Sequence, residues 1–391
     1  MRIMIFTGKG GVGKTSVAAA HGIKSAKEGK NTILISTDMA HNLEDLFEVR
    51  LGKNPVRVMA HLDVYEIDPN YVLEHDFADA TKFLKEFIPA MEGNSMEDFG
   101  MLPGMEELFS LLKIGEIYKS KKYERIIVDC APTGETLSLL KFPELLSWYM
   151  EKLFPIEKVA MRVLAPVSKQ LFKVSLPNQS AMTDIERMYL KLRELQELLK
   201  DKETTSVRLV TIPEKMVVEE TKRNYMYMNL YNFNVDGLYI NRILPQNMDN
   251  EFFDEWLKIQ NMHIKSLKES FAGHLIFEIP WYEEEIKGIE SVSRICKEVL
   301  NDKRLFEPYV NHQRETFFQN EDGYVLSLYI PNAKKEDLDL YQSEKDVVIK
   351  LNNFKRNIPL PNALRNYIIT SAKLEEGLLE ICFEKWEEVD E

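Results

Sequence analysis

The chain has 391 residues, of which 45% are hydrophobic and 29% charged, which is ordinary for a soluble globular protein and long enough for two domains. Its net charge of −13 argues against nucleic acid as a partner, because a phosphate backbone attracts positive charge. We expect a cytoplasmic protein: no apolar run approaches the ~20 residues of a membrane-spanning helix, no signal peptide is visible, and Cys130, Cys296 and Cys382 form no C-x-x-C pair.

The first sixteen residues predict a strand, a phosphate-binding loop and the start of a helix. Residues 2–7 are apolar, and the following Gly8-Lys-Gly-Gly-Val-Gly-Lys-Thr15 has the Walker A spacing G-x-x-x-x-G-K-T. Strand, glycine loop and helix in this order are the context in which the motif binds nucleotide phosphates. The predicted nucleotide-binding residues of the loop are Gly8, Gly10, Gly11, Val12, Gly13, Lys14, Thr15 and Ser16.

Three side chains of the loop have expected catalytic or metal-binding tasks. We expect Lys14 to reach the β- and γ-phosphates of ATP and the Thr15 hydroxyl to bind Mg²⁺. Lys9 is a second lysine in the loop. Two interpretations of it stay open: it acts on the phosphates held by a partner subunit, as an arginine finger does, or it is a solvated surface lysine.

Residues 32–37 predict a second buried strand, which ends at Asp38. Ligands of open α/β sheets bind at the carboxyl ends of the strands, so polar groups here lie where a nucleotide would bind. We expect Asp38 to hold a Mg²⁺-bound water and Asp45 to orient or deprotonate the attacking water. The structural alternative is helix capping, by Asn42 or Asp45.

Residues 62–67 predict another strand, and residues 71–122 a helical region rich in methionine. Methionine suits surfaces that accept varied apolar partners, although it also fills gaps in a core. Residues 125–129 predict a strand that ends in Asp129, at the position of a Walker B carboxylate, and Gly134 follows in a loop that could move on hydrolysis.

Residues 137–200 predict a second helical region, in which the capping-box pattern Thr183-Asp-Ile-Glu186 predicts the start of an amphipathic helix. Three further strands are predicted at 207–212, 237–241 and 274–279. Asn241 ends the second of these and Pro280 follows the third, and an Asn amide suits an adenine edge. Strands that alternate with helices over residues 1–300 predict an α/β fold with a doubly wound, mostly parallel sheet.

The pattern changes after a polar segment, residues 301–314, which we interpret as a linker. Residues 315–391 contain short strand-like runs between turn signals, which predict a small all-β sandwich.

Several motifs resemble those of two related groups: the ArsA-like ATPases of arsenite pumps and the guided-entry ATPases that target tail-anchored proteins. The motifs over residues 1–300 are GKGGVGKT, Ser36-Thr-Asp-Met-Ala-His-Asn-Leu-Glu-Asp45, Leu102-Pro-Gly-Met-Glu-Glu107 and Asp129-Cys-Ala-Pro-Thr-Gly-Glu-Thr136. The tail resembles the α-crystallin domain of small heat-shock proteins, through Ile330-Pro-Asn-Ala, Arg356-Asn-Ile-Pro-Leu-Pro361 and Ala372-Lys-Leu-Glu-Glu-Gly-Leu-Leu379.

This resemblance implies a Mg²⁺-dependent ATPase that works as a head-to-head homodimer. It implies that Lys9 acts across the dimer, that Asp45 lies in a first switch, and that Asp129 lies in a second switch with Gly134. It also implies that Asn241 and Pro280 frame adenine. Helical regions 71–115 and 137–180 would line an apolar groove for hydrophobic or membrane-protein client segments, and whether a membrane receptor exists stays open.

The sequence also departs from the family pattern. Met39 replaces the usual proline of the first switch and Glu135 the usual histidine of the second. Both the C-x-x-C zinc clip of many guided-entry dimers and the clustered thiols of arsenite pumps are missing. We therefore expect an ATPase that handles hydrophobic clients, and the alternative is an ATPase that drives arsenite efflux.

Overall fold

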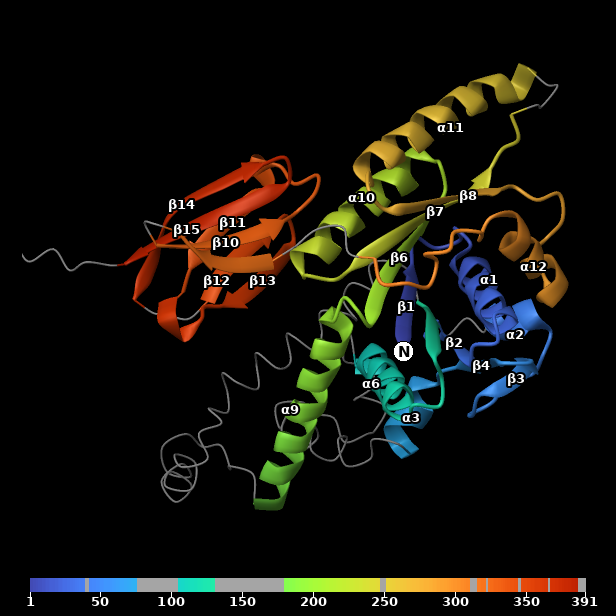
Figure 1. The fold of residues 1–391 in the computed structure, drawn as a ribbon, viewed down its shortest axis with the longest axis horizontal. Helices are drawn as coiled ribbons and strands as arrows, with labels where there is room; N and C mark the ends of the chain where they lie inside the picture. Colours follow the sequence, from blue (N-terminus) through green and yellow to red (C-terminus); the bar gives the residue numbers. More distant parts are fainter. Residues whose placement is uncertain are drawn as a thin grey trace, which may run out of the picture.

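The computed structural model describes residues 1–38, 42–75, 105–130, 179–246, 251–309, 315–320, 323–343, 346–364 and 366–385. Met39, Gly134, Glu135 and most of both predicted client-binding regions lie outside these residues, so their expected roles stay predictions. The described residues form an α/β unit followed by a β sandwich (Figure 1).

One eight-stranded sheet organises the α/β unit, with the strand order β3-β4-β2-β5-β1-β6-β7-β8. All neighbouring strands are parallel except β3 and β4, which confirms the predicted doubly wound, mostly parallel sheet. The half-exposed edge strand β3 was not predicted. The strands are β1 (Arg2–Thr7), β2 (Thr32–Ser36), β3 (Val56–Met59), β4 (Leu62–Glu66), β5 (Arg125–Asp129), β6 (Thr205–Thr211), β7 (Val235–Ile243) and β8 (Leu275–Pro280).

Helices cover both faces of this sheet, so its central strands are buried on both sides and consist of continuous apolar runs. One face packs against α1 (Lys14–Lys27), α2 (Asn42–Phe47) and α12 (Gly288–Glu298). The other packs against α3 (Pro69–His75), α6 (Met105–Lys119), α9 (Gln179–Lys200), α10 (Lys215–Leu230) and α11 (Glu251–Ser270). No helix that the structure describes is both long and apolar enough to cross a membrane.

The predicted start of α9 was wrong. The capping-box pattern at 183–186 lies inside the helix, which begins four residues earlier at Gln179. Ala181 and Met182 are strong helix formers, so the helix extends N-terminal to Thr183 and that residue does not act as a cap.

The C-terminal unit is a sandwich of antiparallel strands, as predicted. One sheet has the order β14-β15-β10-β9 and the other β11-β12-β13. Its core contains Leu326, Ile349, Ile381 and Phe383. The strands are β9 (Glu315–Gln319), β10 (Tyr324–Tyr329), β11 (Leu338–Gln342), β12 (Asp346–Leu351), β13 (Phe354–Pro359), β14 (Tyr367–Glu375) and β15 (Leu378–Lys385), with short 3₁₀ helices at Lys335–Asp337 and Asn362–Leu364.

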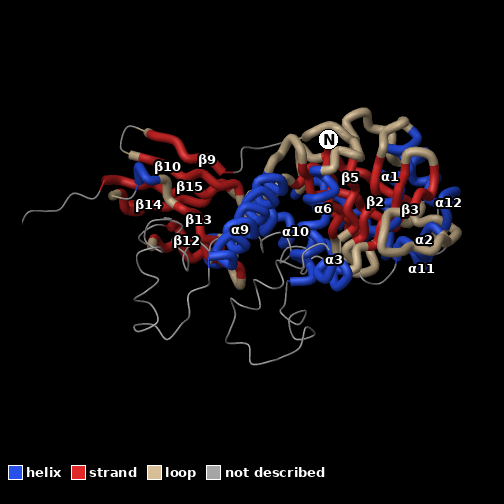
Figure 2. The backbone as a smooth tube through the Cα atoms, turned by 90° about the horizontal axis from the view of Figure 1, so that it is seen from below, coloured by secondary structure: helices blue, strands red, loops and turns tan. Residues whose placement is uncertain are grey.

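The sandwich docks on the end of α10 (Figures 1 and 2). The Tyr227 and Phe354 rings lie with their centroids 3.9 Å apart, and the Tyr231 hydroxyl donates to the Lys355 carbonyl at 3.0 Å. The buried Arg356 donates to the Leu230 carbonyl at 2.6 Å. Leu230 ends α10, so a cation of the sandwich satisfies a carbonyl at the negative end of the helix.

Candidate nucleotide site

The glycines of the loop between β1 and α1 are required by its shape. A Cβ atom on Gly8 would lie 2.1 Å from the Val210 carbonyl oxygen, which no side chain tolerates. Gly11 and Gly13 have φ values of 78° and 91°, in the left-handed region that favours glycine. Val12 is buried in the core between them and anchors the loop. The local sequence therefore fixes an open loop at the start of α1.

Two loop side chains lie at the N-terminus of α1, where the helix dipole favours an anion. Lys14 is the first residue of the helix, and its buried ammonium donates to the Lys9 carbonyl at 3.3 Å. Thr15 follows it. The side chain of Lys9 points elsewhere: its ammonium lies 3.5 Å from the carboxylate of Glu220 on α10. Glu220 had not been predicted, because nothing in its local sequence distinguishes it.

Asp129 is the last residue of β5, and this strand lies between β1 and β2. It is 1% exposed, and neither carboxylate oxygen has a hydrogen-bond partner of normal geometry. Burial raises its pKa from 3.8 to about 7, while the nearby Thr15 hydroxyl and Lys14 ammonium act in the opposite direction. Asp38 and Glu66 raise this pKa further through their negative charge.

Unsatisfied polar atoms gather at this edge of the sheet. The hydroxyls of Thr7, at the end of β1, and of Thr37, just after β2, are also buried without a hydrogen-bond partner. Buried polar atoms are nearly always paired, so three such residues at adjacent strand ends indicate a place for a ligand. Carboxylate and hydroxyl oxygens are ligands that Mg²⁺ accepts, and Asp129, Thr15 and Asp38 therefore fit this cation.

Asp38 and Glu66 hold the start of α2, the helix that carries Asp45. Asn42 donates from its amide to Asp38 at 3.2 Å. Glu66, at the end of β4, accepts hydrogen bonds from the backbone N–H groups of Leu43 and Glu44 at 2.8 and 3.2 Å. The position of Glu66 at a strand end was the sequence signal for this role, and we had not used it.

Asp45 itself is exposed on α2 and has no hydrogen bond or ion pair with any other described residue. The structure therefore brings Lys9, Lys14, Thr15, Asp38 and Asp129 to one edge of the sheet, and it leaves the carboxylate of Asp45 in solvent on a helix next to them.

The predicted strand end at Asn241 was wrong, because β7 continues for two more residues to Ile243. Asn241 lies near the end of β7 and Pro280 ends the neighbouring β8, where Pro280 is exposed and pairs with Ile243. The Asn241 amide donates to the Val12 carbonyl at 2.8 Å, and its oxygen accepts from the Arg242 N–H at 2.9 Å. A Cβ atom on Gly13 would lie 2.3 Å from the Asn241 amide nitrogen. Asn241 thus touches the glycine loop between β1 and α1 directly, a contact that the sequence did not reveal.

The three cysteines lie in separate elements. Cys130 follows β5 and Cys296 lies on α12, both buried, whereas Cys382 lies on β15 of the sandwich. Burial raises the pKa of Cys296 to about 11, so its thiol is protonated at neutral pH. The thiols therefore form no cluster that would bind a soft ion.

Comparison with known proteins gives two family matches. Residues 1–301 match the family model described as anion-transporting ATPase, and residues 321–383 match an HSP20-like domain found in ArsA. A protein of Aquifex aeolicus, provisionally named arsenical pump-driving ATPase 1, is 32% identical over 96% of this chain and 98% of its own length. A similarly named protein of Chlorobaculum tepidum is 32% identical over 98% and 96%. A protein of Pyrenophora tritici-repentis named ATPase get3 is 30% identical over 80% of this chain and 93% of its own length.

Proposed function

Because the chain belongs to the ArsA family of anion-transporting ATPases and is an ATP hydrolase, we propose that its hydrolysis cycle opens and closes a homodimer that binds hydrophobic client segments. The observation that carries the nucleotide part of this proposal is the buried, unpaired Asp129 carboxylate beside the loop. A buried carboxylate with a raised pKa and no partner is a costly arrangement that a bound cation would relieve.

In this proposal the loop N–H groups, Lys14 and the start of α1 bind the phosphates of ATP. Thr15, Asp129 and Asp38 would hold Mg²⁺, directly or through water, and the ion would neutralise phosphate charge. Lys9 leaves Glu220 to contact the phosphates of the partner subunit. Asp45 moves with α2 toward the site and orients the attacking water, and Asn241 and Pro280 frame adenine.

The relatives named as GET3 ATPases support hydrophobic client segments as partners, including those of membrane proteins. These relatives are also the reason to examine whether the chain forms a homodimer and whether it binds a membrane receptor. We place the protein in the cytoplasm, where the buried thiols of Cys130 and Cys296 would stay reduced.

The names of the bacterial relatives favour the second candidate, an ATPase that drives arsenite efflux. As(III) bonds to soft thiolates, which need to be close together. The separation of Cys130, Cys296 and Cys382 argues against this candidate. Hydrolysis that arsenite stimulates in the wild type, but not after replacement of these cysteines by serine, would favour the pump over the client-handling enzyme.

The variant Asp45→Asn tests the hydrolytic part of the proposal. We expect turnover to fall at least about 100-fold, because the water loses its general base, while the Kd for ATP changes less than about threefold. Glu48→Gln is the matched control, since Glu48 is another exposed carboxylate just beyond α2. Turnover within a factor of three of the wild type would remove Asp45 from the mechanism.

The client part is tested with a purified transmembrane segment of a tail-anchored protein. We expect it to co-elute with the full chain, and the amount bound to differ between the nucleotide-free protein and the ATP-loaded Asp45→Asn variant. Equal binding in both states, or none in either, would contradict a client groove controlled by nucleotide.

A further inference from the structure

The helix that begins at the glycine loop is tied to the sheet through a buried histidine. His21 lies on α1, about two turns after Lys14, and its side chain is fully buried. One of its ring nitrogens lies 2.8 Å from the Val17 carbonyl oxygen, and the other lies 2.8 Å from the Tyr239 hydroxyl. Tyr239 belongs to β7, so the second bond joins α1 to a strand that is separated from β1 by β6.

The protons in this chain of hydrogen bonds have defined places. A carbonyl oxygen only accepts, so Nδ1 of His21 carries the proton that it donates to Val17. Burial and the positive charge of Arg208 hold the pKa of His21 well below its usual range, so the ring is neutral and Nε2 accepts from the Tyr239 hydroxyl. The Tyr239 oxygen in turn accepts from the Arg208 guanidinium at 3.1 Å. Each of these donors has an acceptor, and a satisfied buried network favours one arrangement of the groups that it joins.

Aromatic rings hold both side chains in place. The Phe277 ring stacks on Tyr239, with the centroids 4.9 Å apart and an angle of 9° between the planes. The Phe6 ring of β1 lies 4.7 Å from the His21 ring and 5.7 Å from the Tyr239 ring. Close packing leaves few alternative rotamers, so the His21–Tyr239 bond is a stiff link between α1 and β7.

Strand β7 touches the glycine loop at a second point. Asn241 follows Tyr239 by two residues, and side chains at this spacing leave a strand on the same face. The Asn241 amide donates to the Val12 carbonyl at 2.8 Å. The space beside this bond is narrow, because a Cβ atom on Gly13 would lie 2.3 Å from the amide nitrogen. A small shift of α1 against β7 would therefore break the bond or close the gap.

Two attachments fix what one attachment leaves free. A helix held only at its start can tilt about that point, whereas the contacts at Val12 and His21 lie about two turns apart and set the tilt of α1 as well as its position. Lys14 and Thr15 lie between these two contacts along the chain. Their places relative to Asn241 therefore depend on the more distant bond.

We propose that His21 and Tyr239 are positioning residues for ATP hydrolysis, which hold the first turn of α1 at a fixed place relative to Asn241. The inference rests on the proposed nucleotide site, because the two side chains act through the loop and not on the nucleotide. The buried bond then has a task in the reaction besides its contribution to the fold.

The test measures kcat/KM for ATP and the melting temperature of each variant, at a temperature where circular dichroism shows the variant to be folded. His21→Leu removes the acceptor, and we expect kcat/KM to fall about tenfold, because small displacements of positioned groups slow a reaction strongly. His21→Gln is the matched variant, since an amide oxygen can accept where Nε2 does, and it should stay within about threefold of the wild type. Leu and Gln have similar helix propensities, so the two variants differ mainly in the bond to Tyr239.

A double-mutant cycle identifies the bond as the cause. Tyr239→Phe removes only the hydroxyl and should also lower kcat/KM about tenfold, since it breaks the same link. The double variant His21→Leu/Tyr239→Phe should then lose about tenfold as well, because a broken link cannot be broken again. A loss of about 100-fold, the product of two independent effects, would overturn the inference.

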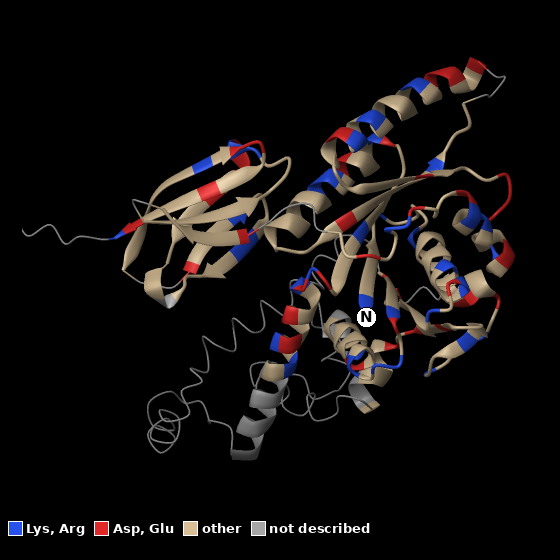
Figure 3. Cartoon of the chain, in the orientation of Figure 1, with Lys and Arg blue, Asp and Glu red and all other residues tan. Residues whose placement is uncertain are grey.

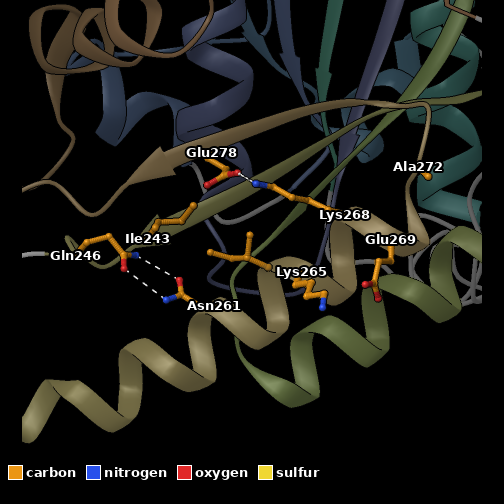
Figure 4. A pocket seen from close by; sticks show the side chains of 9 residues that line it. Ile243, Gln246, Asn261, Lys265, Lys268, Glu269, Ala272 and Glu278 are labelled. Atoms are coloured by element: carbon orange, nitrogen blue, oxygen red, sulfur yellow. Dashed lines mark hydrogen bonds and ion pairs between the residues drawn. The ribbon is translucent and has the colours of Figure 1, made fainter.

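A bridge between another helix and strand provides the control. The charged side chains along α11 are exposed (Figure 3). One of them, Lys268, pairs with Glu278 of β8 beside an open hollow of about 600 Å³ (Figure 4). Lys268→Met also cuts a bond between a helix and the sheet, but not on the helix of the glycine loop, and it should keep kcat/KM within about twofold of the wild type.

Two kinds of failure can be told apart with Lys14→Ala. Hydrolysis at the wild-type rate in this variant would refute the proposed nucleotide site and the inference with it. If Lys14→Ala is inactive while His21→Leu and Tyr239→Phe keep the wild-type kcat/KM, the bond serves only the fold and the inference is refuted, even if the melting temperatures fall. Equal losses in His21→Gln and His21→Leu would also overturn it, because the acceptor would then have no effect.

Discussion

Two buried aspartates of the same sheet have opposite surroundings. Asp236, near the start of β7, is fully buried and accepts hydrogen bonds from Arg208 at 3.0 and 3.4 Å and from Arg2 at 3.4 Å. Asp129, at the carboxyl end of β5, is equally buried, but neither of its oxygens has a hydrogen-bond partner of normal geometry. The chain thus neutralises the carboxylate of Asp236 with arginine and provides no such cation at hydrogen-bond distance for Asp129.

The contrast separates a charge that the fold itself stabilises from one that it leaves without such a partner. Buried carboxylates cost several kcal/mol unless they are paired, so folding alone would not favour the arrangement at Asp129. Buried groups without partners and with shifted pKa values cluster at functional sites. Four experiments test this difference between Asp236 and the Asp129 edge.

The largest expected effect is a loss of stability when Asp236 loses its arginine partner. Arg208→Met should lower the free energy of unfolding by about 3–5 kcal/mol, because it leaves Asp236 short of its main buried partner. Urea denaturation measures this. Arg304→Met, which breaks the exposed pair with Asp302, should change the stability far less, because solvent screens exposed ion pairs. Equal losses of unfolding free energy in the two variants would show that burial does not make the Asp236 pair more important for stability than an exposed pair.

At the unpaired aspartate the effect should fall on activity instead. Asp129→Asn should lower turnover at least about 100-fold, because the proposed Mg²⁺ site loses a charge. The nucleotide-free variant should be as stable as the wild type or more so, since a neutral amide costs less to bury. Asp236→Asn should show the reverse: a clear loss of stability and little change in the turnover of the folded protein. A large loss of stability in Asp129→Asn would make this residue structural as well.

The third expectation concerns pH. The pKa of Asp129 is raised from 3.8 to about 7, so the folded chain holds a proton there that the unfolded chain releases above about pH 4. The stability that this group contributes is complete below about pH 4 and disappears as the pH rises through 7. The unfolding free energy of the wild type minus that of Asp129→Asn should fall by up to about 1.4 kcal/mol per pH unit between pH 5 and 7. A flat difference would contradict the raised pKa.

The smallest effect should come from Asn241. Asn241→Ala removes the hydrogen bond to the Val12 carbonyl, and we expect it to weaken ATP binding about fivefold, as for the loss of one hydrogen bond. Calorimetry with ATP and GTP separates two roles. A similar loss for both nucleotides indicates support of the loop, whereas a loss confined to ATP indicates contact with adenine. No loss for either would leave Asn241 without a role in binding.

Sequence patterns predicted the central sheet well because its strands are buried on both faces. The apolar runs 33–35 and 126–128 are followed by Asp38 and Asp129, so both the strands and the carboxylates near their ends can be recognised in the sequence. The edge strand β3 was missed because it has only four residues, too few for a clear pattern, and is half exposed.

The parts of the site that depend on tertiary contacts could not be predicted. Glu220 lies more than two hundred residues from Lys9, and the Asn241–Val12 bond also joins distant segments. A motif specifies local backbone shape, whereas such pairings depend on which helices and strands become neighbours. The unsatisfied state of Thr7 and Asp129 likewise emerges only when burial and hydrogen bonds are known.

The capping of α10 by Arg356 has a practical consequence for dissecting this protein. A chain cut before β9 would expose the Tyr227 ring and deprive the Leu230 carbonyl of its cation, on the same helix that holds Lys9 through Glu220. Removal of the HSP20-like domain is therefore expected to alter the structure of the ATPase domain as well. A change in the rate of hydrolysis after such a cut would therefore be explained first by the disturbed end of α10. It would not by itself show that the sandwich regulates the α/β unit.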